Sequence, residues 1–140
     1  MEKAINLALS HKVKRSAGVF ESSVDTVYLT TSNGVEAHDK ATRVYLSIRC
    51  FAEKDASGHM VCVSRNLQHF DIDATVNKAA TIATNALNPK HIISGKYDIL
   101  FEHLPFANIL ASVGEAASIF SVEAGLSCLA NRLNKGVASN

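Results

Sequence analysis

Apolar and polar residues alternate most clearly between positions 44 and 50. One side of the alternation holds Val44, Leu46, Ile48 and Cys50, and the other holds Tyr45, Ser47 and Arg49. A period of two residues predicts a β-strand with one buried face. Just upstream, strand-forming residues at 24–31 run into Ser32-Asn33-Gly34, and Asn-Gly tolerates the positive φ of a tight hairpin. We therefore expect a strand over 24–31 and a return strand from Val35, bent near His38-Asp39. A turn at 55–58 and a third strand over 60–64 complete an antiparallel meander.

Two stretches that flank this meander repeat their apolar residues every three or four positions, which predicts amphipathic helices. The first runs from Glu2 to about Lys14, and we expect Gly18 to end that segment. The second begins at an N-cap formed by Asp71 or Asp73 and stops at Asn88-Pro89. Its apolar side is Val76, Ala79, Ala80, Ala83 and Leu87. The sequence thus predicts an α+β fold in which the meander packs against helices in two layers.

The C-terminal third predicts a strand, a helix and a short helix. The strand is the apolar run Tyr97–Phe101, and Pro105 suits the first turn of the helix that follows. Apolar residues at helical spacing in that helix are Ile109, Leu110, Val113, Ala116, Ala117 and Phe120. After a break at Gly125 we expect a short helix over 126–133. The resulting domain boundaries are 1–92 for an α+β domain and 93–140 for the start of a second one.

Composition narrows the classes of function. The net charge of +1 over 140 residues gives no support to a nucleic-acid-binding surface. No run of about 18 apolar residues predicts a membrane span, and the N-terminus lacks the features of a signal peptide. The three cysteines, Cys50, Cys62 and Cys128, are odd in number and lack CxxC spacing. We interpret them as buried free thiols of a cytoplasmic protein, with a Cys50–Cys62 disulfide as the alternative.

Candidate chemistry is sparse. The histidines are His11, His38, His59, His69, His91 and His103, and none has the close helical spacing of a metal-binding pair. The chain has no GxSxG, GxGxxG or P-loop pattern. His38-Asp39 and Glu102-His103 are interpreted as polar surface rather than acid/base pairs. The residues alone therefore predict no catalytic residue, no cofactor and no metal site.

Two long stretches resemble a known family. They are VYLTTSNGVEAHDKATRVYLSIRCFAE in the first half and YDILFEHLPFANILASVGEAASIFSVEAGLSCLANRLNKGVAS in the second. Both are similar to the TldD/PmbA family, described as modulators of DNA gyrase and as metalloprotease-related proteins, with archaeal members the most similar. The resemblance implies a middle piece of a longer two-domain α+β protein.

Active TldD-type members carry an HExxxH motif on the helix after the strand, where two histidines bind zinc and the glutamate activates water. Anchored on Val113-Gly114, on Gly125 and on residues 137–139, the motif falls on Leu110, Ala111 and Glu115. None of the three matches. The resemblance therefore implies a PmbA-like (TldE-like) subunit that lacks the zinc motif and pairs with a TldD-type partner.

Three hypotheses follow for function. The first is a non-catalytic PmbA/TldE-like subunit or fragment of a peptide-processing complex. The second is a stand-alone α+β binding or scaffold domain, and the third is an active zinc metallopeptidase with ligands from elsewhere. We also expect self-association through exposed apolar residues, namely Val13, Val19 and Phe20 near one end and Leu126, Leu129 and Leu133 near the other.

Overall fold

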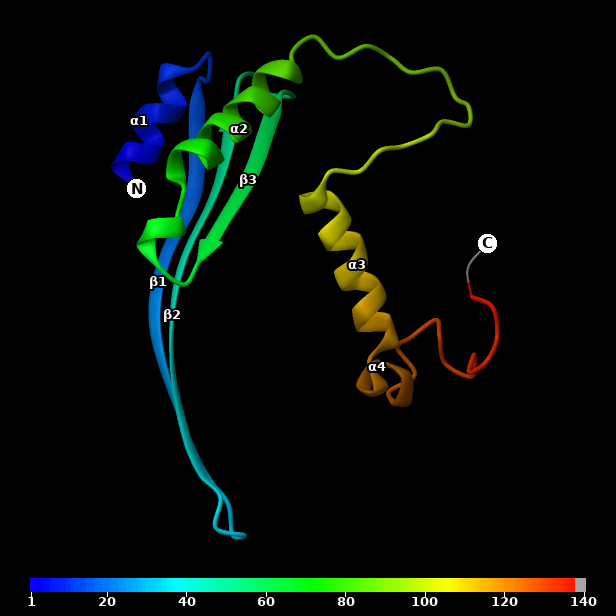
Figure 1. Ribbon diagram of the computed structural model, residues 1–140. Coiled ribbons are helices and arrows are strands. Elements are labelled where there is room, and N and C mark those ends of the chain that lie inside the picture. Colours follow the sequence, from blue (N-terminus) through cyan, green and yellow to red (C-terminus); the bar gives the residue numbers. More distant parts are fainter. Residues whose placement is uncertain (138–140) are drawn as a thin grey trace. The chain divides into compact units, whose positions relative to one another are not determined.

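The computed structural model describes residues 1–137 and divides the chain into two compact units, Met1–Ile92 and Ile93–Asn140 (Figure 1). The elements of the first unit are α1 (Glu2–Ser10), β1 (Arg15–Thr30), β2 (Glu36–Phe51), β3 (Ser57–Ser64), the 3₁₀ turn η1 (Leu67–His69) and α2 (Ile72–Asn85). The second unit holds α3 (His103–Ala117) and α4 (Ile119–Glu123). The predicted α+β fold class is confirmed.

The first unit is built on the predicted meander. Its three strands are antiparallel in the order β1-β2-β3. The hairpin closes where Thr31 N–H donates to Val35 O at 2.9 Å, and Gly34 takes the positive φ, 79°, that the Asn-Gly prediction required. The alternation along β2 is confirmed as well, because one side of the strand is almost fully buried. Its exposed fractions are 8% for Val44, 1% for Leu46, 1% for Ile48 and 0% for Cys50.

Helices α1 and α2 cover that buried side of the sheet (Figure 1). Asp71 is the N-cap of α2, since its Oδ1 accepts from Ala74 N at 2.8 Å. The predicted inner face of α2 is fully buried at Val76, Ala79, Ala80 and Ala83. The small alanine side chains bring the helix backbone very close to β3. A Cβ added to Gly58 would lie 2.1 Å from Ala79 O, so this close contact between helix and strand requires glycine.

The prediction for the N-terminal region was wrong in detail. Helix α1 ends at Ser10 rather than near Lys14, and Ser10 Oγ donates to Leu7 O at 2.7 Å while His11 is extended. The chain then joins the sheet, because Lys14 N–H donates to Phe51 O at 2.8 Å. Strand β1 consequently begins nine residues before the expected Val24, and Gly18 lies inside it rather than ending a helix. Pairing with β2 over its whole length overrides the local helical pattern.

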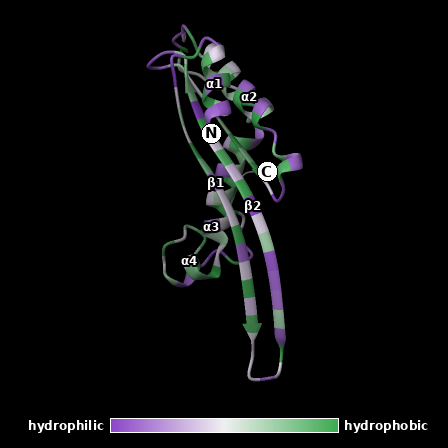
Figure 2. Cartoon of the chain, turned by 90° about the vertical axis from the view of Figure 1, so that its left-hand side faces the viewer, coloured by the Kyte–Doolittle hydropathy of each residue, from purple (hydrophilic) through white to green (hydrophobic). Residues whose placement is uncertain are grey.

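The β1–β2 hairpin extends beyond the third strand. Strand β3 pairs with β2 only between Val44 and Phe51, so residues 24–30 and 36–42 pair only with each other. The register is constant along all 16 pairs, and the bend expected near His38-Asp39 is absent from β2. Figure 2 shows apolar positions recurring along β1 to its end, within this two-stranded part.

The second unit departs further from prediction. The run Tyr97–Phe101 forms no strand, and Leu100 is 98% exposed, because the run has no strand beside it to pair with in the described part of its unit. Helix α3 begins as predicted, with Pro105 in its first turn. Residues 126–133 form turns instead of a helix: Asn131 has a positive φ of 60°, and the Ser127 hydroxyl bonds to the backbone of Ala116 and Leu129.

In positions 1–137 no helix has the length and apolarity needed to cross a membrane. The alignment anchor at positions 137–139 lies mostly outside the described residues, since description ends at Val137.

Candidate functional site

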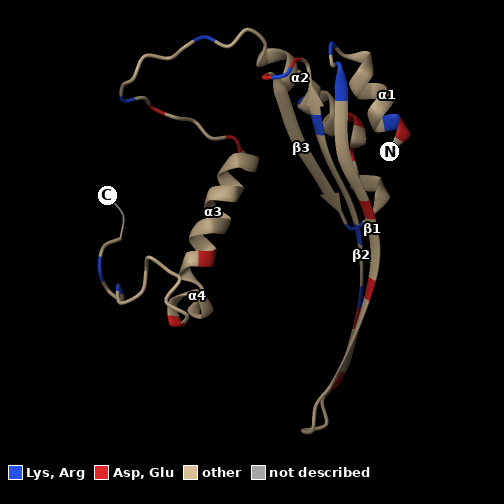
Figure 3. Cartoon of the chain, turned by 180° about the vertical axis from the view of Figure 1, so that it is seen from behind, with Lys and Arg blue, Asp and Glu red and all other residues tan. Residues whose placement is uncertain are grey.

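Helix α3 carries the positions at which the family resemblance places a zinc motif. The helix buries none of its residues. Its apolar side is Phe106, Ile109, Leu110 and Val113, with exposed fractions of 46, 42, 53 and 56%. Figure 3 shows that α3 has no Lys or Arg and carries its acidic residue near the C-terminal end. The predicted amphipathic pattern is therefore present, but among the described residues of this unit no layer covers the apolar side.

The three motif positions cannot hold zinc. Leu110, Ala111 and Glu115 are all exposed on α3. A leucine and an alanine side chain have no lone pair for a metal, and one carboxylate falls short of the three protein ligands that a catalytic zinc requires. Within residues 1–137, no three His, Cys, Asp or Glu side chains come together in a way that could hold a metal ion. The donor set on this helix therefore does not fit the metal that the family motif implies.

His11, His38 and His59 make structural contacts. A ring nitrogen of His11 lies 2.8 Å from Asn77 Oδ1, which ties the end of α1 to α2. His38 stacks on Tyr28 across the hairpin, with ring centroids 6.1 Å apart. His59 Nε2 lies 2.9 Å from Ser47 Oγ on the side of the sheet away from the helices. Burial, and then the charge of Arg49, lower the pKa of His59, so this ring favours its neutral form.

The cysteines are free thiols, as predicted, but they differ in burial. Cys50 is buried beneath the helices, and burial raises the pKa of its thiol, which keeps it protonated and unreactive. Cys62 is half-buried on the neighbouring strand, where it faces Leu46 while Cys50 faces Gly58. That offset leaves the alternative Cys50–Cys62 disulfide unformed. The prediction that Cys128 is buried was wrong, because it is exposed in the turns that follow α4.

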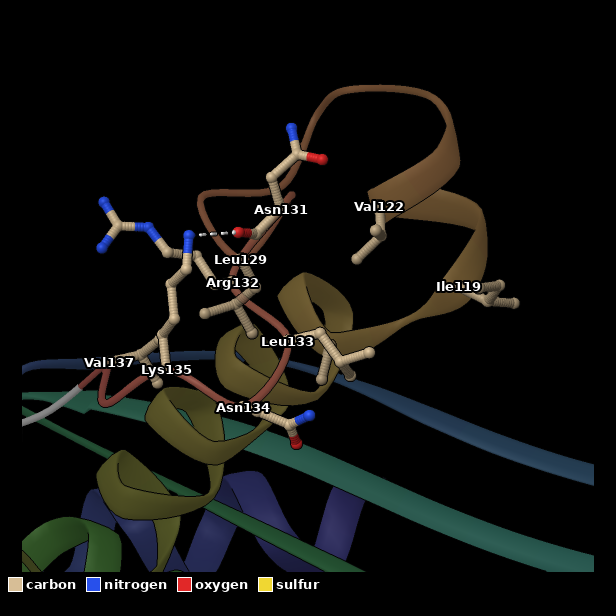
Figure 4. Close-up of a pocket in the computed structure, with 10 residues that line it drawn as sticks. Ile119, Val122, Leu129, Asn131, Arg132, Leu133, Asn134, Lys135 and Val137 are labelled. Carbon is tan, nitrogen blue, oxygen red and sulfur yellow. Dashed lines mark hydrogen bonds between the residues drawn. The ribbon is translucent and has the colours of Figure 1, made fainter.

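The second unit contains a pocket of about 580 Å³ between α4 and the turns after it (Figure 4). Most of its lining is apolar: Ala117, Ile119, Val122, Leu129, Leu133 and Val137. Arg132 and Lys135 add two cations, and Lys135 Nζ donates to Asn131 O at 3.2 Å. A mostly apolar concavity with a few polar groups is the usual form of a small-ligand site. Its apolar lining and two cations suit an apolar group that carries a carboxylate.

Sequence reasoning found this region only in part. The expected exposed patch included Leu126 and Leu133, which are 79 and 88% exposed, whereas Leu129 is half-buried against the pocket. At the other end, Val19 and Phe20 are exposed as predicted, but Val13 is buried at 6% exposure and that part of the prediction was wrong. The pocket walls at Asn131 and Asn134 were missed. The available signal was the asparagines themselves, since asparagine tolerates the positive φ that both adopt.

Comparison with known proteins places the chain in a family. A family model described as the PmbA/TldA metallopeptidase central domain matches residues 1–87, which is most of the chain. The chain belongs to this family. The match covers the sheet, α1 and α2, so the TldD/PmbA resemblance seen in the sequence is confirmed. No curated protein sequence matches the chain.

Two crystal structures share the fold of this PmbA/TldA-family chain. Both are of proteins described as modulators of DNA gyrase, one from Bacteroides thetaiotaomicron and one from Thermotoga maritima. The first has a TM-score of 0.78 at 20% identity, over 99% of this chain and 34% of its own. The second has a TM-score of 0.84 at 20% identity, over 96% of this chain and 32% of its own. The chain thus spans about a third of the length of these two proteins, and the expected likeness to archaeal members stays a prediction.

Proposed function

We propose that the chain is the central region of a PmbA-like, non-catalytic subunit in a cytoplasmic peptide-processing metallopeptidase complex. Membership of the PmbA/TldA family supports the metallopeptidase context. The observation that carries the non-catalytic role is the side-chain chemistry of α3. Leu110 and Ala111 cannot ligate or activate anything at the positions where an active member carries a histidine and the catalytic glutamate. The subunit would supply surface to the complex, while a TldD-type partner supplies the zinc.

The exposed side of α3 agrees with such a role. An apolar helix face without a covering layer favours contact with another molecule over exposure to water. The pocket beside α4 gives a place where a peptide end could rest, and among the described residues its lining includes no serine, cysteine or histidine and no group of metal ligands. Binding and hydrolysis would then be divided between two subunits.

Zinc content tests the non-catalytic assignment. The purified chain, prepared without chelators, should hold far less than one zinc per chain by elemental mass spectrometry. Glu115→Gln should leave any residual zinc unchanged, as should the matched control Glu123→Gln at the end of α4. Stoichiometric zinc that Glu115→Gln reduces and Glu123→Gln does not would overturn the proposal, because α3 would then be a metal site.

A stand-alone binding or scaffold domain is the second candidate. It is favoured by the first unit, which encloses its own buried core between one sheet and two helices. Co-purification separates the two candidates. The chain should retain a TldD-type protein that carries HExxxH on a column, and Leu110→Lys on the exposed side of α3 should weaken that retention. A chain that retains no such protein under any condition would favour the stand-alone domain.

A further inference from the structure

The two units of the chain differ in how much surface they bury. The first unit encloses a core of buried apolar residues between its sheet and its helices. In the described part of the second unit, residues 93–137, Ser121 is the only buried residue, at 7% exposure. Folding costs conformational entropy at every residue that becomes ordered, and the burial of apolar surface is the main term that offsets this cost. The second unit therefore lacks the term that stabilises the first.

Helices α2 and α3 can be compared directly, because they have 14 and 15 residues. Helix α2 buries five of its residues, whereas α3 buries none. The apolar side of α3 keeps between 42 and 56% of each side chain in water, at Phe106, Ile109, Leu110 and Val113. Isolated helices of about 12–15 residues are marginally stable in water, and most helices in proteins depend on the packing of one face. Helix α2 has that packing and α3 does not.

Local interactions do not replace that packing in α3. Its N-cap residue, Glu102, makes no side-chain cap hydrogen bond, whereas the Asp71 carboxylate caps α2 by accepting from Ala74 N at 2.8 Å. The first turn of α3 has no acidic residue and its last turn has no basic one, so no charged side chain complements the helix dipole there. Glu115 is the only Asp, Glu, Lys or Arg in the helix, so no ion pair forms along it. Gly114 lowers the helix propensity further.

The segment before α3 adds no support. Residues 88–101 form neither helix nor strand, and no backbone-to-backbone hydrogen bond within residues 1–137 involves them. Their aliphatic side chains are open to water, with exposed fractions of 80% for Ile92, 84% for Ile93 and 98% for Leu100. This segment therefore supplies neither a hydrogen-bonded scaffold nor a buried layer to the helix that follows it.

The pocket beside α4 depends on α3. Ala117, at the end of α3, lines the pocket. The Ser127 hydroxyl donates to Ala116 O in the last turn of α3 and accepts from Leu129 N at 3.0 Å. These bonds hold the turns that line the rest of the pocket to the end of the helix. Without α3 the Ser127 hydroxyl has no acceptor at a fixed position, so helix and pocket form together.

We propose that residues 93–137 are a conditionally folded unit. While α3 is uncovered, the first unit is folded, but α3 and the pocket beside α4 are populated in a minority of molecules. Covering the apolar side of α3 supplies the missing burial and shifts the population toward the folded unit. The same shift creates the pocket, so covering α3 and filling the pocket favour each other by linkage. This equilibrium is a property of the chain itself and holds whichever surface covers α3.

Amide hydrogen exchange of the 140-residue chain tests the proposal. The measurement is made at a concentration at which light scattering gives the monomer mass of 15.0 kDa, so that no second copy covers α3. Amides of α2 should exchange at least about a hundredfold more slowly than those of α3, because α2 opens only with the core. Slow exchange in α3 that appears only above the monomer concentration range supports the proposal, since a second copy then supplies the cover. A monomer in which α2 and α3 exchange at equal rates overturns it.

Two glycine variants test the same equilibrium by far-ultraviolet circular dichroism of the monomer. Gly114 lies in α3 with nothing within 4 Å, so an added methyl group changes only the helix propensity. Gly114→Ala should raise the equilibrium constant for forming α3 about fivefold, and the helical signal of the chain should rise with it. Gly136→Ala is the matched control, because Gly136 also has open space but lies beyond α4, and it should leave the signal unchanged. A signal that Gly114→Ala leaves unchanged would show that α3 is already fully formed, which overturns the proposal.

Discussion

The contact between α2 and β3 at Gly58 gives the sharpest prediction about stability. A methyl group on Gly58 would lie 2.1 Å from Ala79 O, 2.6 Å from Ala83 N and 2.8 Å from Ile82 Cβ. Two of these neighbours are backbone atoms of α2, so no side chain can rotate away. The helix would have to move back by about 1.3 Å to restore a contact of 3.4 Å with Ala79 O.

That displacement would loosen the tightest part of the core. Val76, Ala79, Ala80 and Ala83 are fully buried against the sheet, and all of them move with the helix. Overpacking a core costs about 1–3 kcal/mol when neighbouring groups can adjust. Here the neighbour is a helix backbone, so we expect Gly58→Ala to lower the free energy of unfolding by about 3 kcal/mol or more. With a urea dependence of about 1–3 kcal/mol/M, the unfolding midpoint should fall by at least about 1 M.

Two other glycines serve as controls in the same urea titration followed by circular dichroism. Gly34 has open space around it but a φ of 79°, so Gly34→Ala should cost only the strain of a left-handed residue, about 1–2 kcal/mol. Gly114 lies in α3 with nothing within 4 Å, so Gly114→Ala should leave stability equal or higher. A Gly58→Ala variant that unfolds within about 0.5 kcal/mol of the parent would refute the close packing of α2 on β3.

Two further predictions concern titratable groups. The pKa of His59 lies below its ordinary value of 6.5, so the unfolded chain binds this proton at a higher pH than the folded chain does. The contribution of His59 to stability should therefore be fully present above about pH 6.5 and should be lost as the pH falls through the folded pKa. Urea unfolding midpoints measured across this pH range should show the loss of stability. His59→Gln should make the dependence of the midpoint on pH shallower. If the urea midpoint depends on pH equally steeply in His59→Gln, the lowered pKa of His59 in the folded chain is contradicted. With a thiol-reactive disulfide reagent, exposed Cys128 should react first and buried Cys50 only as the domain unfolds. Cys128→Ser should therefore remove the fast phase of the reaction. A fast phase that survives Cys128→Ser would show that another thiol is accessible.

The part of the fold that the sequence predicted best is the part where local pattern and tertiary environment agree. Alternation over 44–50, the Asn33-Gly34 turn and the Asp71 cap each describe a short-range requirement that the core also satisfies. The prediction of where β1 begins was wrong because the residues that pair with its first half lie some 20 to 36 positions away along the chain. No local sequence pattern indicates that pairing. A tertiary contact decided between helix and strand there.

The prediction for the second unit was wrong for a different reason, because there the local pattern was clear but the tertiary partner was missing. The apolar run Tyr97–Phe101 indicates that burial is favourable, but apolar density does not say which surface supplies it. Turn-forming asparagines at 131 and 134 were present in the sequence and outweigh the helical spacing of nearby leucines. For the candidate site, the exposed positions of Leu110, Ala111 and Glu115 came from structure, whereas their lack of ligand chemistry could be seen from the residues alone.

The length of the β1–β2 hairpin has a consequence for how the domain opens. Helices and β3 cover β2 only from Val44 onward, so one continuous strand passes from a packed layer into a ribbon held by a single partner. Local unfolding free energies follow such differences in burial. The ribbon between Val24 and Thr42 can therefore fray and re-form while the core stays closed, and the boundary at Val44 acts as a hinge between a slow and a fast region of the same strand.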